Sequence, residues 1–280
     1  MKRIFLNLKR FDIPPELGGV NRISTPRDWG GHIVRQIQDG LKSYGGGESE
    51  FAVFFPEAHI LSAVDALCGD SPVRVGCQSV HRDDTAIGGN FGAFTSSRPA
   101  SAMKALGCMA TIIGHCEERR NLLGILHEAG ADSEDAVDRI LNKQALCAAK
   151  AGLATLFCVG ETAEQQSCWE ATLRRQLEQG LAGLEPGQYT VAYEPVWAIG
   201  PGKTPPSRDY IQMVAKFIKE TTSGAAVVYG GGLKAENAAM LASIPEIDGG
   251  LIALTRFTGE IGFYPEEYLE IIKIYMEGAA

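Results

Sequence analysis

A glutamate at the start of a proline- and glycine-bounded segment is the most informative chemical feature of the sequence. Glu194 ends the apolar stretch VAYE, and residues Pro195–Thr204 carry apolar side chains between prolines and glycines. Such a segment can close over a site while its end residues absorb the dihedral change. Closure excludes water, which makes a carboxylate a stronger base. The pattern predicts either a carboxylate base under a lid or a structural turn capped by the glutamate.

A histidine occupies a comparable position earlier in the chain. His115 follows the apolar run Ala110–Gly114 and precedes a polar stretch. Amide donors at the start of a helical turn disfavour the protonated imidazole, and a neutral imidazole can donate a hydrogen bond to a carbonyl oxygen. The alternative is a metal site on His115 and Glu117, but this stretch has no H-E-x-x-H pattern and no further ligands nearby. We therefore expect no metal.

Three consecutive glycines follow an apolar run near the C-terminus. Tyr229 is followed by Gly230, Gly231 and Gly232, so the backbone amides there carry no obstructing side chains. Consecutive N–H groups before a helix can bind a phosphate without basic residues. Taken alone, three glycines are equally typical of a turn.

The composition limits the classes of function. The 280 residues include 26 Lys and Arg against 34 Asp and Glu, a net charge of −8, which argues against a general nucleic-acid binder. No stretch approaches the ~18 apolar residues that a membrane helix needs. The seven cysteines form no C-x-x-C pair, so neither a disulfide framework nor a zinc ribbon is expected. We expect a cytoplasmic protein that acts on a small molecule.

Strand-like and helix-like stretches alternate along the whole chain, with helix-start signals such as Ser133 and Ser207. We expect strands at Arg3–Asn7, Glu50–Phe55, Val73–Cys77, Ala110–Gly114, Ala154–Val159, Tyr189–Glu194, Ala225–Tyr229 and Gly250–Leu254. We expect helices at Trp29–Ser43, Ala58–Leu67, Ala100–Leu106, Glu134–Ala151, Ala163–Leu184, Arg208–Thr222, Ala235–Ala242 and Pro265–Met276. This alternation is typical of an α/β protein with parallel strands. Eight units and no linker predict one (β/α)8 barrel domain over residues 1–280.

Functional residues of such barrels lie at the C-terminal ends of the strands. That rule selects Glu194, His115, the glycines after Tyr229, and also Asn7 and Lys9 after the first expected strand. An isolated lysine or glutamate is usually a solvated charge. Here the repeated placement after strands indicates a shared site.

Together these segments resemble the triosephosphate isomerase family, which has the TIM-barrel fold. The matching stretches occur in the family's order and span nearly the whole chain: Asn7–Lys9, Gly92–Thr95, Ile112–Glu117, Cys158–Thr162, Tyr193–Thr204 and Tyr229–Gly231. The resemblance implies cofactor-independent isomerisation of an aldose phosphate and a ketose phosphate, as in glycolysis and gluconeogenesis.

The resemblance also implies roles for individual residues. Glu194 would be the base that moves a proton between adjacent carbons, His115 would polarise the substrate oxygens, and Lys9 would stabilise the enediolate. Asn7 would orient the site, and Glu117 would support Lys9. The residues expected to hold the phosphate are Gly200, Gly231, Gly232, Ala253 and Leu254.

Family members are usually homodimers in which a long third loop reaches the partner's site. Thr95 matches the position that reaches across. Here the third loop has 13 residues between Gln78 and Gly92, more than we expect from the family. We expect Arg98 to pair with Glu118, because the arginine that usually follows the family's glutamate is replaced by Glu118.

The eighth loop also departs from the family. Ala253 and Leu254 stand where two glycines are expected, and the loop is extended from Thr255 to Gly262. Arg256 is expected to contact the phosphate or an extra substrate hydroxyl, or else to pair with Glu260. The main expectation is interconversion of glyceraldehyde 3-phosphate and dihydroxyacetone phosphate. The alternatives are an isomerase of another short sugar phosphate, such as a tetrulose phosphate, and a barrel that binds a phosphometabolite without catalysis.

Overall fold

Eight parallel strands close into a barrel in the computed structural model, which describes residues 1–45, 47–200 and 202–279. The strands follow one another around the barrel in chain order, and the first pairs with the last through Arg3 and Gly249. Their bounds are β1 (Lys2–Asn7), β2 (Ser49–Phe55), β3 (Val73–Gln78), β4 (Ala110–Ile113), β5 (Ala154–Val159), β6 (Tyr189–Tyr193), β7 (Val227–Tyr229) and β8 (Gly249–Ile252). The expected (β/α)8 fold is confirmed.

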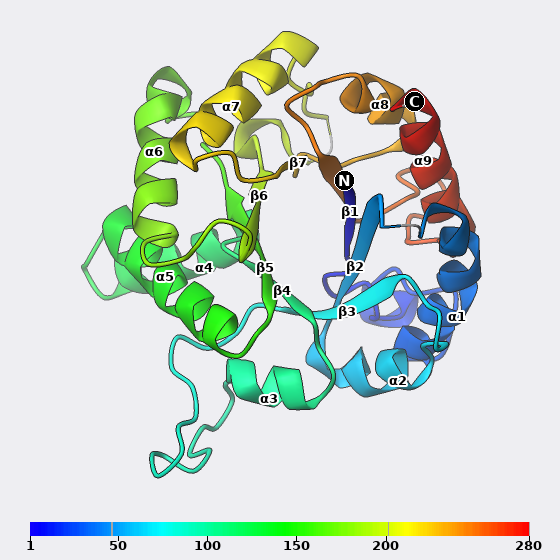
Figure 1. Ribbon diagram of the computed structural model, residues 1–280, viewed down its shortest axis with the longest axis horizontal. Helices are drawn as coiled ribbons and strands as arrows, with labels where there is room; N and C mark the ends of the chain where they lie inside the picture. Colours follow the sequence, from blue (N-terminus) through cyan, green and yellow to red (C-terminus); the bar gives the residue numbers. More distant parts are fainter. Residues whose placement is uncertain (46, 201, 280) are drawn as a thin grey trace.

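Helices surround the barrel on all sides (Figure 1). Their bounds are α1 (Trp29–Leu41), α2 (Ile60–Asp65), α3 (Ala100–Ala105), α4 (Cys116–Glu128), α5 (Glu134–Lys150), α6 (Trp169–Gly180), α7 (Arg208–Thr221), α8 (Ala235–Ala242) and α9 (Pro265–Gly278). The expected caps of α5 and α7 are present. Ser133 Oγ accepts a hydrogen bond from the third amide of α5 at 3.1 Å, and Ser207 Oγ does so for α7 at 3.3 Å. Within the described ranges, no helix is both long and apolar enough to cross a membrane.

The strands bury both faces, and this produces two apolar layers. Alternate strand residues such as Phe5, Phe54 and Leu156 form a cluster that is separate from the larger cluster between strands and helices. This separation follows from the two-residue side-chain period of a strand. The inner layer is tightly packed: a Cβ at Gly76 of β3 would lie 2.6 Å from the Phe54 ring.

The structure corrects several expected boundaries. The expected helix from Ala163 to Leu184 is shorter, because a 3-10 turn (Gln166–Cys168) precedes α6. The eighth strand ends at Ile252 rather than Leu254. Helix α4 was not among the expected helices; it contains Gly124 and has no fully buried residue, so its apolar pattern is weak.

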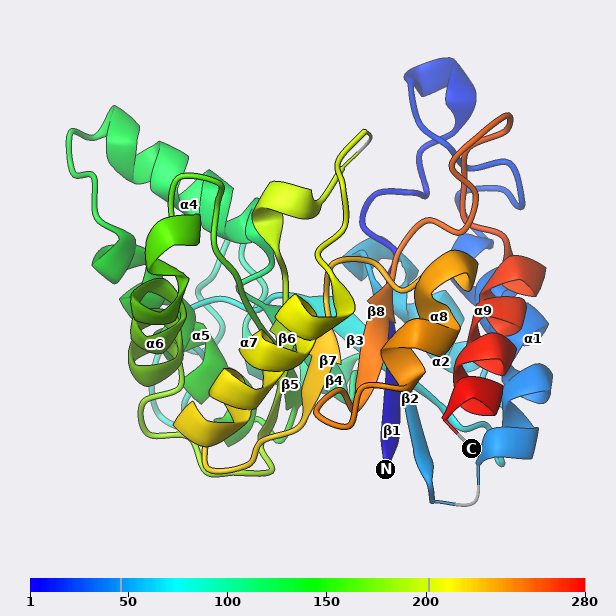
Figure 2. The ribbon, with the colours of Figure 1, turned by 90° about the horizontal axis from the view of Figure 1, so that it is seen from above.

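Two long segments rise from neighbouring strands on the same side of the barrel (Figure 2). Residues 8–28 follow β1 and residues 253–264 follow β8, and the Arg22 guanidinium donates to the Ile261 carbonyl at 3.2 Å. Asp12 anchors the first segment: it accepts two hydrogen bonds from Arg10 at 2.8 and 2.7 Å and lies 3.1 Å from His59. Burial acts to raise the pKa of Asp12, but Arg10 and His59 outweigh burial and hold it below its usual value.

Candidate active site

Glu194 lies directly after β6, at the C-terminal end of the barrel, and its side chain is only 1% exposed. Its backbone N–H donates to the Val159 carbonyl at 2.8 Å. Glycines on both sides make room for it. A Cβ at Gly160 would lie 1.8 Å from the Glu194 carbonyl oxygen, and one at Gly230 would lie 2.7 Å from Glu194 Cγ. The two glycines therefore leave the space that the Glu194 backbone and side chain occupy.

The carboxylate of Glu194 has one satisfied oxygen and one free oxygen. Oε2 accepts a hydrogen bond from the Cys116 amide at 2.8 Å. Oε1 lies 3.2 Å from His115 Nε2 and has no hydrogen-bond partner among the described residues. Burial raises the pKa of Glu194, although the charges of His115 and Lys9 and the Cys116 amide act in the opposite direction. This buried carboxylate is therefore a stronger proton acceptor than an exposed one.

His115 caps the N-terminus of α4, as expected for a histidine entering a helical turn. Its Nδ1 accepts a hydrogen bond from the Glu117 amide at 3.2 Å. A nitrogen that accepts an amide proton carries no proton itself, so this contact leaves Nε2 as the ring nitrogen that can donate. Nε2 is the nitrogen that faces Glu194.

Lys9 follows β1 and lies across from α4. Its φ of 41° is in the left-handed region, an uncommon conformation for a lysine. Its amide donates to Asn7 Oδ1 at 3.1 Å, and its Nζ donates to Glu117 at 2.7 Å. Burial acts to raise the pKa of Glu117, but the hydrogen bond and charge of Lys9 outweigh burial and lower it. The ammonium is therefore held beside the site.

Gln78, which was not among the expected site residues, links the ends of β1 and β2 beside Lys9. Gln78, at the end of β3, donates from Nε2 to Asn7 Oδ1 at 3.3 Å, to the Lys9 carbonyl at 3.0 Å and to the Phe54 carbonyl at 3.1 Å. These bonds hold the backbone in the conformation that Lys9 requires. A glutamine within a strand carries no distinctive signal, and only its position at a strand end could have drawn attention to it.

The segments after β7 and β8 present backbone donors to the same end of the barrel. In the described structure the amides of Gly231, Gly232, Ala253 and Leu254 donate no hydrogen bond to protein atoms. Gly232 has a φ of 97°, which is open to glycine at no steric cost. Ala253 and Leu254 are half-buried. Four unpaired amides on two adjacent loops can accommodate an anion.

The lid segment begins with the 3-10 turn Val196–Ala198 and includes Gly200, whose φ is 120°. Pro201, which the expected lid includes, lies outside the described residues. The segment is anchored by Glu161, a fully buried glutamate in the stretch Cys158–Thr162. Its Oε1 accepts hydrogen bonds from Trp197 Nε1 at 2.7 Å, Tyr193 OH at 2.9 Å and Tyr210 OH at 3.2 Å.

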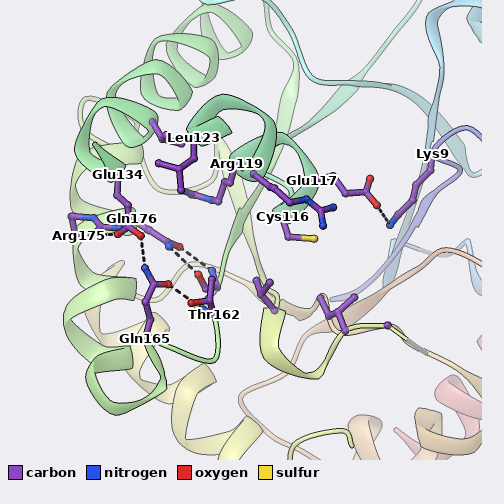
Figure 3. A pocket seen from close by; sticks show the side chains of 16 residues that line it. Lys9, Cys116, Glu117, Arg119, Leu123, Glu134, Thr162, Gln165, Arg175 and Gln176 are labelled. Atoms are coloured by element: carbon purple, nitrogen blue, oxygen red, sulfur yellow. Dashed lines mark hydrogen bonds and ion pairs between the residues drawn. The ribbon is translucent and has the colours of Figure 1, made fainter. Parts of the chain in front are cut away.

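A cavity of about 490 Å³ opens beside these residues, between α4, the segment after β5 and the lid. Figure 3 shows the Lys9–Glu117 pair at one end of it and Cys116 near its middle. Ile199 and Gly200 of the lid also line it. Burial raises the pKa of the Cys116 thiol to about 12, so this thiol is a poor nucleophile at neutral pH.

Two expectations about charged side chains are wrong. Glu118 does not pair with Arg98 in the described structure. Its carboxylate accepts hydrogen bonds from the Ser79 hydroxyl at 2.5 Å, the Gln144 amide at 3.1 Å and the Gly114 backbone at 2.7 Å. These three neutral donors already satisfy the carboxylate, and Arg98 is exposed.

Arg256 does not pair with Glu260, the side-chain partner that was expected as one alternative. It pairs with Glu267 through hydrogen bonds of 2.5 and 2.7 Å and lies 3.7 Å above the Tyr264 ring. Glu260 instead lies 3.9 Å from Arg22. Glu267 is in the first turn of α9, where the chain returns to the barrel, so it is closer to Arg256 than the loop tip is.

Comparisons with known proteins agree with this arrangement. Residues 30–273 match the family described as "Triosephosphate isomerase". The chain is 36% identical over 220 residues to a triosephosphate isomerase of Moorella thermoacetica, which covers 74% of this chain and 81% of that protein. It is 32% identical over 259 residues to one of Marinobacter nauticus, with coverage of 88% and 93%. The crystal structure of triosephosphate isomerase from Bartonella henselae superposes with a TM-score of 0.73 at 26% identity and covers 98% of this chain and 99% of that one. This chain belongs to the triosephosphate isomerase family.

Proposed function

We propose that the chain interconverts dihydroxyacetone phosphate and glyceraldehyde 3-phosphate by proton transfer, without a cofactor. The observation that carries the proposal is the buried Glu194 carboxylate, whose free oxygen lies 3.2 Å from His115 Nε2. A base and a hydrogen-bond donor therefore lie next to each other. Both are needed to remove a proton from a carbon beside a carbonyl group.

In the proposed reaction, Glu194 takes a proton from C1 of the ketose phosphate. The electron pair of that C–H bond forms a C1–C2 double bond, and the carbonyl pair moves to O2. His115 gives its Nε2 proton to O2 and takes the proton of O1, so the intermediate remains an enediol or enediolate. Glu194 then returns its proton to C2, and C1 becomes the aldehyde. The ammonium of Lys9 stabilises the negative charge on the oxygens.

The phosphate of the substrate is assigned to the loops after β7 and β8. The unpaired amides of Gly231, Gly232, Ala253 and Leu254 supply donors, and Gly200 adds another when the lid closes. Alanine and leucine keep the amide donors of the glycines expected there. Because Arg256 is paired with Glu267, it is not required for this site.

We further propose a cytoplasmic homodimer built on the segment between β3 and α3. Figure 1 shows this segment projecting away from the barrel. It carries Ile87 and Phe91, which are 109% and 89% exposed, and Thr95, which is also exposed, follows them toward α3. A partner subunit would cover this apolar surface, and Thr95 would approach the partner's site. Sedimentation equilibrium tests this assembly: a dimer is expected, and a monomer at micromolar concentration would contradict it.

The test of the function is a steady-state assay of the purified chain with glyceraldehyde 3-phosphate, with tetrulose phosphates, and with Glu194→Gln as the matched variant. Turnover of the triose phosphate that Glu194→Gln abolishes is expected. A higher kcat/KM for four-carbon substrates would identify a tetrulose phosphate as the substrate in place of the triose phosphate. The long segments 8–28 and 253–264 could then contact the additional carbon. If the chain binds phosphate esters but turns over no substrate, the proposed isomerase function is wrong.

A further inference from the structure

Three potential metal ligands of different chemical type converge beside the base. One nitrogen of His115, the sulfur of Cys116 and one carboxylate oxygen of Glu194 all lie within 4.8 Å of one another. Glu194 Oε1 lies 3.2 Å from His115 Nε2, and Cys116 Sγ lies 3.7 Å from His115 Nδ1, so these two contacts are made with opposite nitrogens of the ring. Ligands of one tetrahedral zinc ion are about 3.2–3.7 Å apart, because zinc–ligand bonds are about 2.0–2.3 Å long. Because one ion binds one nitrogen of the ring, a rotation of the His115 ring or of the Cys116 side chain that turns the sulfur and the carboxylate oxygen to the same nitrogen would complete the set.

The free oxygen of Glu194 is an independent sign of a vacant ligand position. Glu194 is 1% exposed, and its Oε1 is buried without a hydrogen-bond partner among the described residues while it points at the His115 ring. A buried carboxylate oxygen without a donor is costly and attracts a cation or a proton donor. Cys116 lines the 490 Å³ cavity, so an ion can reach the cluster from solvent.

We propose that His115, Cys116 and Glu194 form an inhibitory site for a thiophilic divalent cation such as Zn²⁺. A sulfur, an imidazole nitrogen and a carboxylate suit Zn²⁺ or Co²⁺, whereas Mg²⁺ prefers oxygen ligands alone. On binding, the Cys116 thiol releases its proton to solvent and the thiolate binds the ion. The neutral imidazole binds through one nitrogen and keeps its proton on the other. Solvent fills the fourth position.

Inhibition follows because the ion uses the two groups that the reaction needs. With Glu194 and His115 bound to the metal, neither can exchange protons with a substrate, and the ion stands where the substrate oxygens would lie. The inhibition rests on the proposed isomerase function, but the binding does not. Zn²⁺ should therefore compete with substrate, and a chelator should reverse its effect.

The experiment measures binding and activity separately on the full chain. Titration with Co²⁺ reports thiolate coordination through the sulfur-to-cobalt charge-transfer band, and equilibrium dialysis with Zn²⁺ gives the stoichiometry and Kd. The test variant is Cys116→Ser, which keeps the backbone amide, and the control is Cys68→Ser, which removes an exposed thiol outside the cavity. Circular dichroism verifies that each variant folds.

One Zn²⁺ per chain is expected, with the cobalt band lost in Cys116→Ser, a Zn²⁺ Kd at least about 100-fold weaker in that variant, and both unchanged in Cys68→Ser. The same shift is expected in the inhibition constant relative to each variant's own uninhibited rate. An active wild-type chain with no cobalt band, or a band and Kd that Cys116→Ser leaves unchanged, would overturn the site. A chain that binds Zn²⁺ through Cys116 but isomerises no sugar phosphate would keep the site and overturn the proposed function instead.

Discussion

Shortening the side chain of Glu194 by one methylene group tests whether this carboxylate is the base. In Glu194→Asp the carboxylate retracts by about 1.5 Å, the length of one C–C bond. The hydrogen bond from the Cys116 amide, now 2.8 Å, would lengthen beyond hydrogen-bonding range. The carboxyl group would remain buried, so its position is the property that changes.

The size of the effect follows from this displacement. A misplacement of 1 Å costs about 10²-fold in rate, so kcat should fall at least about 100-fold, which corresponds to about 2.7 kcal/mol in the activation free energy. Lys9 and the amides that we propose to bind the phosphate are unaffected, and KM should change less than about threefold.

Steady-state kinetics in the aldose-forming and ketose-forming directions measure both parameters. Glu178→Asp is the matched control, because the Glu178 side chain is 61% exposed on α6, and it should retain wild-type kcat and KM. A Glu194→Asp variant that retains kcat within about fivefold while KM rises would refute the reasoning, because it would make Glu194 a binding residue only.

Three further perturbations test other parts of the structure. Gly230→Ala places a Cβ 2.7 Å from Glu194 Cγ and should displace this side chain, which should lower kcat by at least about tenfold while the far-ultraviolet circular dichroism spectrum stays normal. An unchanged kcat would contradict this displacement. Trp197→Phe removes a 2.7 Å donor from the buried Glu161 and should lower the free energy of unfolding by about 1–3 kcal/mol in urea titrations. Asp12→Asn should destabilise the chain at pH 7 but much less at pH 3. The folded-state pKa of Asp12 is lowered, so its contribution is present above the unfolded pKa of about 3.9 and is lost as pH falls through the folded value. An equal loss of stability at both pH values would contradict the pairing.

The sequence was most informative about the barrel and the residues at its strand ends. Eight apolar runs separated by amphipathic stretches predict parallel strands, and the strand-end rule then selects Glu194, His115 and Lys9. Glu194 and His115 come within 3.2 Å of each other, and Lys9 pairs with Glu117 next to them, because the fold gathers all strand ends on one side of the barrel. This prediction required no knowledge of individual side-chain contacts.

Partner choice by long charged side chains could not be predicted in this way. Arg256 and Glu118 each have several partners within reach. Which partner forms the pair depends on loop geometry that the local sequence does not encode. The Cys116 amide and Gln78 were missed for a different reason. A backbone donor has no residue-type signal, and a glutamine has no chemistry that distinguishes a positioning role from a surface one.

The most direct test of proton transfer through Glu194 is isomerisation in ²H₂O. A carboxylate that carries the proton between two carbons can exchange it with solvent during the enediol(ate) stage. The wild-type product is therefore expected to contain deuterium at the carbon that receives the proton, and Glu194→Gln is expected to give neither product nor label. Full-rate conversion without any solvent deuterium in the product would contradict the mechanism, because it would indicate a direct hydride shift between the carbons.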